Sequence, residues 1–151
     1  VVIHPQSVVH SMVQYLDTSV VAQLGTPDMR VPIAYGLAWP ERITSGAKAL
    51  DFKSLVDLTF DVLDAQRFPC MSLAWEVLCA PSGTPAILNA ANEIAVEAFL
   101  EKRIRFDQIH FVNRETLDGL CTPRIMCIGD LLELDTKARA FAKNVVRSME
   151  Y

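Results

Sequence analysis

The sequence has no uninterrupted hydrophobic run that could cross a membrane, although 51% of its residues are hydrophobic. A transmembrane helix needs about 20 consecutive apolar residues, and charged residues or proline interrupt every apolar stretch of this chain earlier. The start of the chain also lacks the basic segment and apolar segment that mark a secretory signal. We therefore expect no membrane partner.

Runs of basic residues are missing as well, since no more than two Lys or Arg residues follow one another. The net charge is −4, and the isoelectric point is about 5.3. A nucleic-acid-binding protein usually presents a basic face to the phosphates, so we expect no nucleic-acid partner.

Cysteine and histidine are scarce and widely spread. The four cysteines follow one another at spacings of 9, 42 and 6 residues, without a CxxC pair, and three histidines accompany them. Zinc sites usually combine closely spaced Cys and His ligands, so we expect neither a bound metal nor a disulfide. We expect buried thiols in a reducing cytoplasm at Cys70, Cys79, Cys121 and Cys127.

The remaining composition indicates a folded chain with an apolar surface that another subunit or domain would cover. Charged residues make up 21% of the 151 residues, and the mean hydropathy of +0.23 excludes a disordered chain. A chain this short has much surface for its volume, so the apolar excess indicates contact with another subunit or domain. The chain opens on the apolar residues 1–3 without Met, so we expect a fragment of a longer protein.

Strand and turn signals follow one another in the first part of the chain. Residues 7–15 form a β-rich run whose two faces carry no consistent charge, which is typical of a strand covered on both sides. A turn at 17–19 and a second strand at 20–24 complete a predicted β-hairpin.

A short helix is expected after the hairpin. Thr26 is expected to cap a turn at 27–30, and Pro32 would interrupt a single continuous helix. The helix is therefore predicted from Pro32 to Ala38, where Trp39-Pro40 ends it because a residue before proline avoids the α region.

The second half of the chain has helical periodicity. Residues 40–68 read as a connector with an extended piece at 58–63, and four amphipathic segments follow. Asp107 is expected to cap the third helix, and a turn near 130–134 to precede the last. The predicted helices span 69–79, 84–102, 107–120 and 135 onward, and the second carries the apolar stripe Ile87, Ala91, Ile94, Ala95, Ala98 and Phe99.

Four segments of the chain, in order, resemble the 1-deoxy-D-xylulose 5-phosphate reductoisomerase family. Residues 3–13 read IHPQSVVHSMV, residues 24–34 read LGTPDMRVPIA, residues 38–42 read AWPER, and residues 88–93 read LNAANE. Beyond about residue 104 the resemblance rests on pattern and length. Thr18 stands where the family commonly has Gly after Asp, a departure that affects the turn and not the chemistry.

The resemblance implies an enzyme of the bacterial cytoplasm that converts 1-deoxy-D-xylulose 5-phosphate to 2-C-methyl-D-erythritol 4-phosphate for isoprenoid precursors. Such enzymes use NADPH and Mg²⁺ or Mn²⁺, and they are homodimers. A dinucleotide-binding domain and most of the catalytic domain, with the metal-binding carboxylates, would precede residue 1. We therefore expect this chain alone to bind neither NADPH nor metal and to be inactive.

The resemblance also predicts the domain organisation and the fold class, an α+β fragment. Residues 1–39 would be the strands and hairpin that end an α/β catalytic domain. Residues 40–68 would be the connector, and residues 69–151 a C-terminal α-helical domain resembling a four-helix bundle.

His10 is the best candidate for a residue of the catalytic site. The resemblance places this second His of IHPQSVVHSMV near the active site, where its imidazole would orient a metal-binding carboxylate or a substrate hydroxyl from the periphery. Val8 and Met12 are expected to give the ring an apolar wall. The alternative is a strand histidine that bonds a backbone carbonyl, and the other two histidines are expected to be structural or solvated.

Pro27, Asp28 and Met29 form a second candidate. The resemblance places this turn beside the nicotinamide and the substrate, with Pro27 and Met29 as cofactor contacts. The alternative is a capped helix start with Met29 packed in the core.

Asn89, Asn92 and Glu93 share one face of the predicted second helix, at i, i+3 and i+4. One Glu with two amides is a poor set of metal ligands. We therefore expect these side chains to bond the connector or the catalytic domain.

Composition and periodicity alone fit a different class of protein equally well. This alternative is a non-enzymatic helical interaction module with a β-hairpin dimerisation arm. A dinucleotide-binding sequence upstream would favour the enzyme, and the HPQS and PDMR segments disfavour other NADP-linked oxidoreductases.

Overall fold

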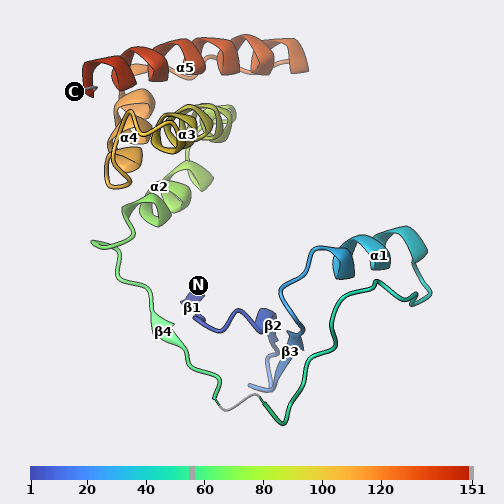
Figure 1. Ribbon diagram of the computed structural model, residues 1–151. Coiled ribbons are helices and arrows are strands. Elements are labelled where there is room, and N and C mark those ends of the chain that lie inside the picture. The colour runs from blue at the N-terminus through green and yellow to red at the C-terminus, as the bar shows by residue number, and fades with distance from the viewer. Residues whose placement is uncertain (55–56, 150–151) are drawn as a thin grey trace. The chain divides into compact units, whose positions relative to one another are not determined.

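The computed structural model describes residues 1–54 and 57–149 and divides the chain into two compact units. The first unit comprises Val1–Leu63 and the second Asp64–Tyr151. Strands and one helix make up the first unit, whereas the described elements of the second are all helices (Figure 1). The predicted α+β class is therefore confirmed, while the domain boundaries after residues 39 and 68 stay predictions.

The predicted hairpin consists of β2 (Val9–Gln14) and β3 (Val20–Leu24), which pair antiparallel. The carboxylate of Asp17 closes the turn, since its Oδ1 accepts hydrogen bonds from the backbone N (2.9 Å) and the Oγ (2.6 Å) of Ser19. Thr18 adopts a φ of 71°, in the left-handed region. An Asx-type hydrogen bond thus holds a turn for which glycine would otherwise be favoured.

Neither face of this hairpin is covered by the residues that the structure describes, so the expected cover on both sides stays a prediction about another subunit or domain. All residues of β2 after Val9 are exposed, and Val8, just before the strand, is buried. The reason is that the sheet has only two strands, and two strands cannot shield their own faces.

The helix α1 (Arg30–Ala38) begins two residues earlier than predicted and ends before Trp39 as predicted. Pro32 is tolerated because it lies in the first turn, where backbone N–H groups have no partner within the helix. Thr26 is not the cap, since its hydroxyl donates to the Lys48 carbonyl at 2.9 Å. Asp28 Oδ1 instead accepts from the Arg30 backbone N at 2.9 Å.

The start of the chain pairs with the expected extended piece, as β1 (Val2–Ile3) lies antiparallel to β4 (Asp61–Val62). His4 anchors this pairing. Its Nδ1 lies 2.8 Å from the Thr59 carbonyl oxygen, and its ring stacks on Phe60 with centroids 4.7 Å apart. Gln6 Nε2 adds a hydrogen bond of 2.8 Å to Thr59 Oγ1, so the structural role expected for His4 is confirmed.

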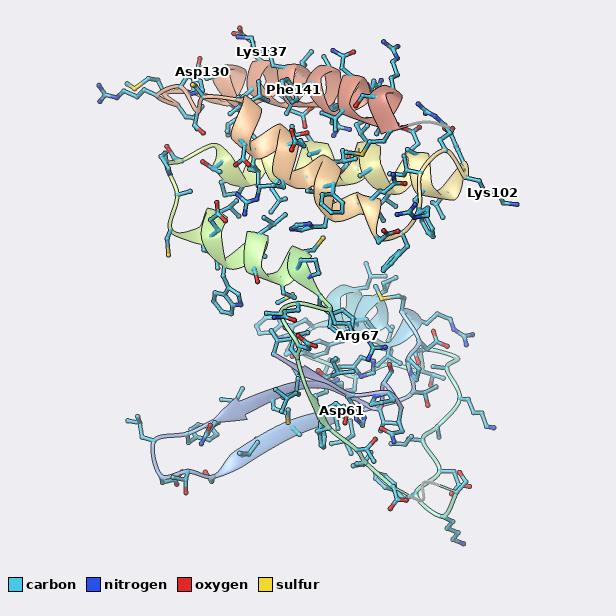
Figure 2. All side chains as sticks on the ribbon, turned by 90° about the vertical axis from the view of Figure 1, so that its left-hand side faces the viewer. Asp61, Arg67, Lys102, Asp130, Lys137 and Phe141 are labelled. Carbon is cyan, nitrogen blue, oxygen red and sulfur yellow. The ribbon has the colours of Figure 1, made fainter. Side chains whose placement is uncertain are left out.

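The second unit is a layered helical domain. The helices α3 (Thr84–Leu100) and α4 (Gln108–Gly119) pack together, α5 (Ile128–Met149) covers one side of them, and α2 (Pro69–Leu78) covers the other (Figure 1). Lys137 of α5 points away from the other helices (Figure 2). The core consists of Ile87, Ala90, Ala91, Ile94, Ala95, Ala98, Ile104, Ile109, Val112, Leu134, Ala138, Ala142 and Val146.

Two helix starts differ from the predictions. Asp107 makes no capping hydrogen bond, because its carboxylate pairs with Arg105 at 2.7 Å. The last helix begins at Ile128 and not near residue 135. Asp130 Oδ2 accepts from the backbone N atoms of Met126 (2.8 Å) and Cys127 (3.0 Å) and so satisfies N–H groups at the helix start. Residues 150 and 151 of the predicted helix lie outside the described part of the chain.

The expectation of buried cysteines is wrong. All four are free thiols on exposed residues, because Cys70 and Cys79 lie at the two ends of α2 and the other two lie between α4 and α5. Helix ends and loops lie at the surface, where even an apolar side chain gains little burial.

Candidate functional site

His10 occupies a β-bulge. The pairs Val9–Leu24 and Ser11–Gln23 flank a shift of register, which leaves His10 as the extra residue of β2. A bulge disrupts the ladder and re-aims a side chain, and bulges are frequent next to active sites. The position of His10 therefore has a structural feature that suits an orienting imidazole.

The surroundings of His10 in this chain are open. The residue is exposed, and the neighbouring Met12 is 46% exposed. Its imidazole has no hydrogen-bond partner within residues 1–54 and 57–149, so the alternative of a carbonyl-bound strand histidine finds no support there. The expected apolar wall of Val8 and Met12 is wrong for the chain by itself, because Met12 stays accessible.

The turn at 27–29 follows β3 at the end of the hairpin where the His10 bulge lies. Leu24 pairs with Val9, and the Gly25 backbone N donates to the Val8 carbonyl at 2.9 Å. The chain then reaches Pro27 within two residues. The structure thus brings the His10 bulge and the start of the second candidate site close together along the backbone.

The carboxylate of Asp28 forms a bidentate ion pair with the guanidinium of Arg30. The Nε atom donates to Oδ1 at 3.0 Å, and Nη2 donates to Oδ2 at 2.6 Å. These bonds, together with the Arg30 backbone N–H, lower the pKa of Asp28 from 3.8 to about 2. Asp28 is therefore a carboxylate anion whose hydrogen bonds stabilise the start of α1.

Pro27 and Met29 flank this carboxylate and are exposed, Met29 by 71%. The alternative in which Met29 packs in the core is therefore wrong. The N-cap Met29 makes no side-chain capping bond, and Asp28, one residue earlier, instead accepts a hydrogen bond from the Arg30 backbone N. Two exposed apolar side chains beside a fixed anion can offer contact area to a ligand or to another domain.

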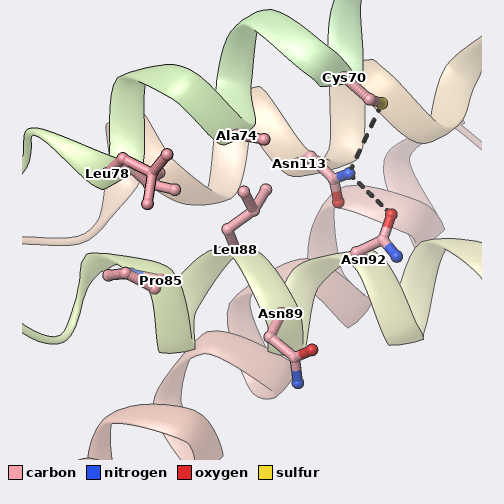
Figure 3. A pocket seen from close by; sticks show the side chains of 9 residues that line it. Cys70, Ala74, Leu78, Pro85, Leu88, Asn89, Asn92 and Asn113 are labelled. Carbon is pink, nitrogen blue, oxygen red and sulfur yellow. Dashed lines mark hydrogen bonds between the residues drawn. The ribbon is translucent and has the colours of Figure 1, made fainter. Parts of the chain in front are cut away.

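The polar face of α3 has its partners inside the helical unit, which corrects the expectation of bonds to the connector or catalytic domain. Asn89 Nδ2 donates to Glu93 Oε1 at 3.1 Å. Asn92 Oδ1 accepts from Asn113 Nδ2 at 3.1 Å (Figure 3). The carboxylate of Glu93 pairs with Arg139 at 2.6 Å, and the hydrogen bonds from Arg139 and then Asn89 lower its pKa.

Three polar residues of the helical unit, Arg139, Arg114 and Asn113, have partners that were not predicted from the sequence. Arg139 joins Glu93 and Asp135, and Arg114 joins Glu76 of α2 at 2.5 Å. The spacing i, i+4 between Asp135 and Arg139 was a readable signal. Asn113 interrupts the buried face of α4, and a polar residue on such a face calls for a buried partner.

Metal ligands do not cluster in the described part of the chain. Within residues 1–54 and 57–149, no three His, Cys, Asp or Glu side chains come together as a metal site would require. The candidate site in the first unit therefore supplies the imidazole of His10 and the apolar turn with Pro27 and Met29. These groups suit the orientation of a ligand and contact with it.

None of the helices within the described ranges combines the length and the apolar character that a membrane crossing demands.

The comparisons with known proteins agree with one another. The family model described as the DXP reductoisomerase C-terminal domain matches residues 24–141. Two curated relatives, both 1-deoxy-D-xylulose 5-phosphate reductoisomerases, are 54% identical. The relative from Pseudomonas fluorescens matches over 143 residues, which are 95% of this chain and 36% of that protein. The relative from Nitrosococcus oceani matches over 147 residues, 97% of this chain and 37% of that protein.

Solved structures give the same family. The 1-deoxy-D-xylulose 5-phosphate reductoisomerase from Zymomonas mobilis in complex with NADPH superposes with a TM-score of 0.87 at 45% identity, covering 96% of this chain and 38% of that one. A DOX-P reductoisomerase with NADPH, fosmidomycin and magnesium gives 0.89 at 41% identity, covering 97% and 38%. The chain spans little more than a third of the length of these relatives, and it belongs to the 1-deoxy-D-xylulose 5-phosphate reductoisomerase family.

Proposed function

We propose that this chain is the C-terminal part of an NADPH- and divalent-metal-dependent reductoisomerase that converts 1-deoxy-D-xylulose 5-phosphate to 2-C-methyl-D-erythritol 4-phosphate. The observation that carries the proposal is the 54% identity to a relative of that name across 95% of the chain. The complexes of similar structures with NADPH, fosmidomycin and magnesium support the assignment of cofactor and metal. The bacterial relatives and the free thiols support a cytoplasmic location.

The catalytic and binding roles of the enzyme would be divided between this chain and the rest of the protein. The family resemblance implies that the dinucleotide fold and the metal-binding carboxylates lie in another part of the enzyme, and this chain matches only 36% of the Pseudomonas fluorescens relative. When bound, the divalent metal would polarise the carbonyl and hydroxyl oxygens of the substrate. The residues of this chain would contact and orient the substrate and the cofactor, and they would help to enclose the active site.

His10 would act as a positioning residue at the edge of the active site. Its bulge fixes where the ring leaves the strand, and its free ring nitrogens can hold a carboxylate or a hydroxyl in place. The exposed turn with Pro27 and Met29 would contact the nicotinamide from one side. These three roles rest on the family resemblance together with the exposure of the residues.

The hairpin would contribute to a homodimer contact. Several of its apolar side chains are exposed, and a soluble protein gains by covering such a surface. They include Met12, Val13, Val20 and Val21. Replacement of Val21 by Asp in the full-length protein should shift the mass measured by light scattering from dimer toward monomer, and an unchanged dimer would contradict this contact.

The activity is tested by following NADPH oxidation. The full-length protein that contains this chain should oxidise NADPH only when both 1-deoxy-D-xylulose 5-phosphate and Mg²⁺ or Mn²⁺ are present. The 151-residue chain alone should show no rate above the blank. A full-length protein without substrate-dependent oxidation would favour the non-enzymatic interaction module.

A further inference from the structure

Thr59, in the segment predicted as the connector, bonds to the start of the chain through its carbonyl, its hydroxyl and its backbone N–H. The carbonyl oxygen lies 2.8 Å from Nδ1 of His4. The hydroxyl accepts from Gln6 Nε2 at 2.8 Å, and the backbone N donates to Gln6 Oε1 at 3.3 Å. The amide of Gln6 thus binds two groups of one residue that lies 53 positions away in sequence, which fixes where this amide lies.

The residue after Gln6 has an unusual backbone conformation. Ser7 adopts a φ of 50°, in the left-handed region that residues other than glycine rarely enter. Its backbone N donates to the His4 carbonyl at 3.1 Å and closes a turn over residues 4–7. A strained conformation of this kind persists only where the surrounding structure holds it. The contacts of Thr59 with His4 and Gln6 supply that support on one side of Ser7.

On its other side, the turn leads directly into the strand that carries His10. Val8 follows Ser7 and is buried, and its carbonyl accepts from the Gly25 backbone N at 2.9 Å. The bulge with His10 begins just beyond this bond. Ser7 is therefore fixed between Thr59 and the hairpin, three residues before His10. Because so few residues separate them, the backbone at Ser7 sets where the strand with His10 begins.

The second candidate turn is fastened to the same segment. The hydroxyl of Thr26, just before Pro27, donates to the Lys48 carbonyl at 2.9 Å. Residues 40–68, which carry no candidate site residue of their own, thus bond to both stretches of chain that do. This arrangement suits a segment that holds the site residues in position.

We propose that Thr59 is a positioning residue for the reaction. By holding His4 and Gln6, it keeps the strained turn at Ser7 in place. Through this turn it sets the position of the His10 imidazole. The inference rests on the proposed function, in which His10 orients a group of the active site, and it extends that role to a hydroxyl which acts through another residue.

Turnover should respond to this contact more strongly than stability does. Thr59 and Ser7 are exposed in this chain, and a hydrogen bond between accessible groups replaces bonds to water, so that its net contribution to stability is modest. Catalysis is more sensitive to position, because a displacement of about 1 Å of a catalytic group can lower a rate about 100-fold. Loss of the Gln6–Thr59 bond should therefore appear in the kinetics first.

The test measures kcat for substrate-dependent NADPH oxidation, and the melting temperature, on the full-length protein that contains this chain. Thr59→Val keeps the shape of the side chain and removes the acceptor of the bond from Gln6 Nε2. We expect kcat to fall about 3–10-fold, less than the range of about 10–100-fold expected for loss of His10 itself. Thr59→Ser keeps the hydroxyl and should turn over near the wild-type rate. A Thr59→Val enzyme with wild-type kcat would overturn the proposal.

A kinetic double-mutant cycle shows whether Thr59 acts through His10. In the His10→Ala background, Thr59→Val should lower kcat no further, because the ring that Thr59 positions is gone. Independent losses that multiply would overturn the proposal, as would wild-type turnover of His10→Ala alone. A wild-type protein without substrate-dependent NADPH oxidation would refute the proposed function itself, and this inference with it.

Thr84→Val is the matched control. The Thr84 hydroxyl donates to the Pro81 carbonyl at 2.8 Å within the helical unit, so the same substitution removes a hydroxyl hydrogen bond there and should leave kcat unchanged. An equal fall in kcat for Thr84→Val would trace the loss to stability and overturn the proposal. Should Thr59→Val melt too early for kinetics, Gln6→Met removes the same bond from the other partner, and its wild-type turnover would equally overturn the proposal.

Discussion

Arg139 of α5 lies with its Nη2 atom 2.6 Å from Oε2 of Glu93 in α3. The same guanidinium donates from Nε to Asp135 Oδ2 at 2.7 Å, one turn earlier in its own helix. Glu93 lies on the polar helix face that was expected to bond the connector or the catalytic domain. Its contact with Arg139 shows that this carboxylate fastens α3 to α5.

We predict that Arg139→Met lowers the free energy of unfolding by about 0.5–1 kcal/mol, because pairs this accessible are screened by solvent. The side chains of Arg139 and Glu93 are 33% and 54% exposed. Urea unfolding of Arg139→Met, Glu93→Gln and the double variant measures the coupling. Strictly additive losses would show that the pair contributes nothing.

Gly119 and Gly36 should respond in opposite directions to the same change. A Cβ atom at Gly119, the last residue of α4, would overlap the ring of Phe141 on α5, whereas a Cβ at Gly36 in α1 meets nothing within 4 Å. We predict that Gly119→Ala destabilises the protein by about 1–3 kcal/mol through overpacking. Gly36→Ala should stabilise it by up to about 1 kcal/mol, since Ala favours helix.

Thermal melts of the two variants test this contrast. A further variant, Gly119→Ala with Phe141→Leu, should regain part of the lost stability, because the smaller side chain leaves room for the new methyl group. If Gly119→Ala melts like the wild type, α4 and α5 do not approach as closely as the structure has them.

His10→Ala in the full-length enzyme should reduce turnover about 10–100-fold, the range for a residue that orients a ligand-binding group. The free energy of unfolding should change by less than about 0.5 kcal/mol, because the residue is exposed in this chain. Steady-state kinetics and a melt on one preparation separate the two effects. His4→Ala is the comparison, since it removes the anchor on Thr59 and Phe60 and should lower the melting temperature more. An early-melting His10→Ala enzyme with wild-type turnover would make His10 structural.

Asp28 should titrate far below an ordinary aspartate. Its pKa is about 2 in the folded chain against an ordinary 3.8, so its contribution to stability is present above about pH 4 and is lost as the pH falls toward 2. Carboxyl NMR shifts measure this midpoint directly. Arg30→Gln should raise the pKa of Asp28 only part of the way, because the backbone N–H of residue 30 still donates to it.

Asp17 is the matched control for this titration. Its pKa is lowered by Ser19, with no cation involved, so Arg30→Gln should leave it unchanged. A midpoint for Asp28 that is insensitive to Arg30→Gln would show that the ion pair is not formed in solution.

Local patterns in the sequence were enough for most of the elements. The hairpin, the end of α1 before Trp39-Pro40 and the helices α2 to α4 could be predicted from turn residues, proline and periodicity, because these signals act within a few residues. The start of α5 was misjudged, since the capping bonds of Asp130 reach back to residues 126 and 127. The four segments from IHPQSVVHSMV to LNAANE identified the family, which the comparisons confirm.

What the sequence determined by itself was therefore the class of fold, the family and most of the helix and strand assignments. Only the tertiary structure decided which side chains meet: His4 with Thr59, Glu93 with Arg139, and Asn113 with Asn92. These partners are separated by 55, 46 and 21 residues in sequence. Helical and strand periods fix which face a residue occupies, but the neighbour across that face is set by how whole elements pack.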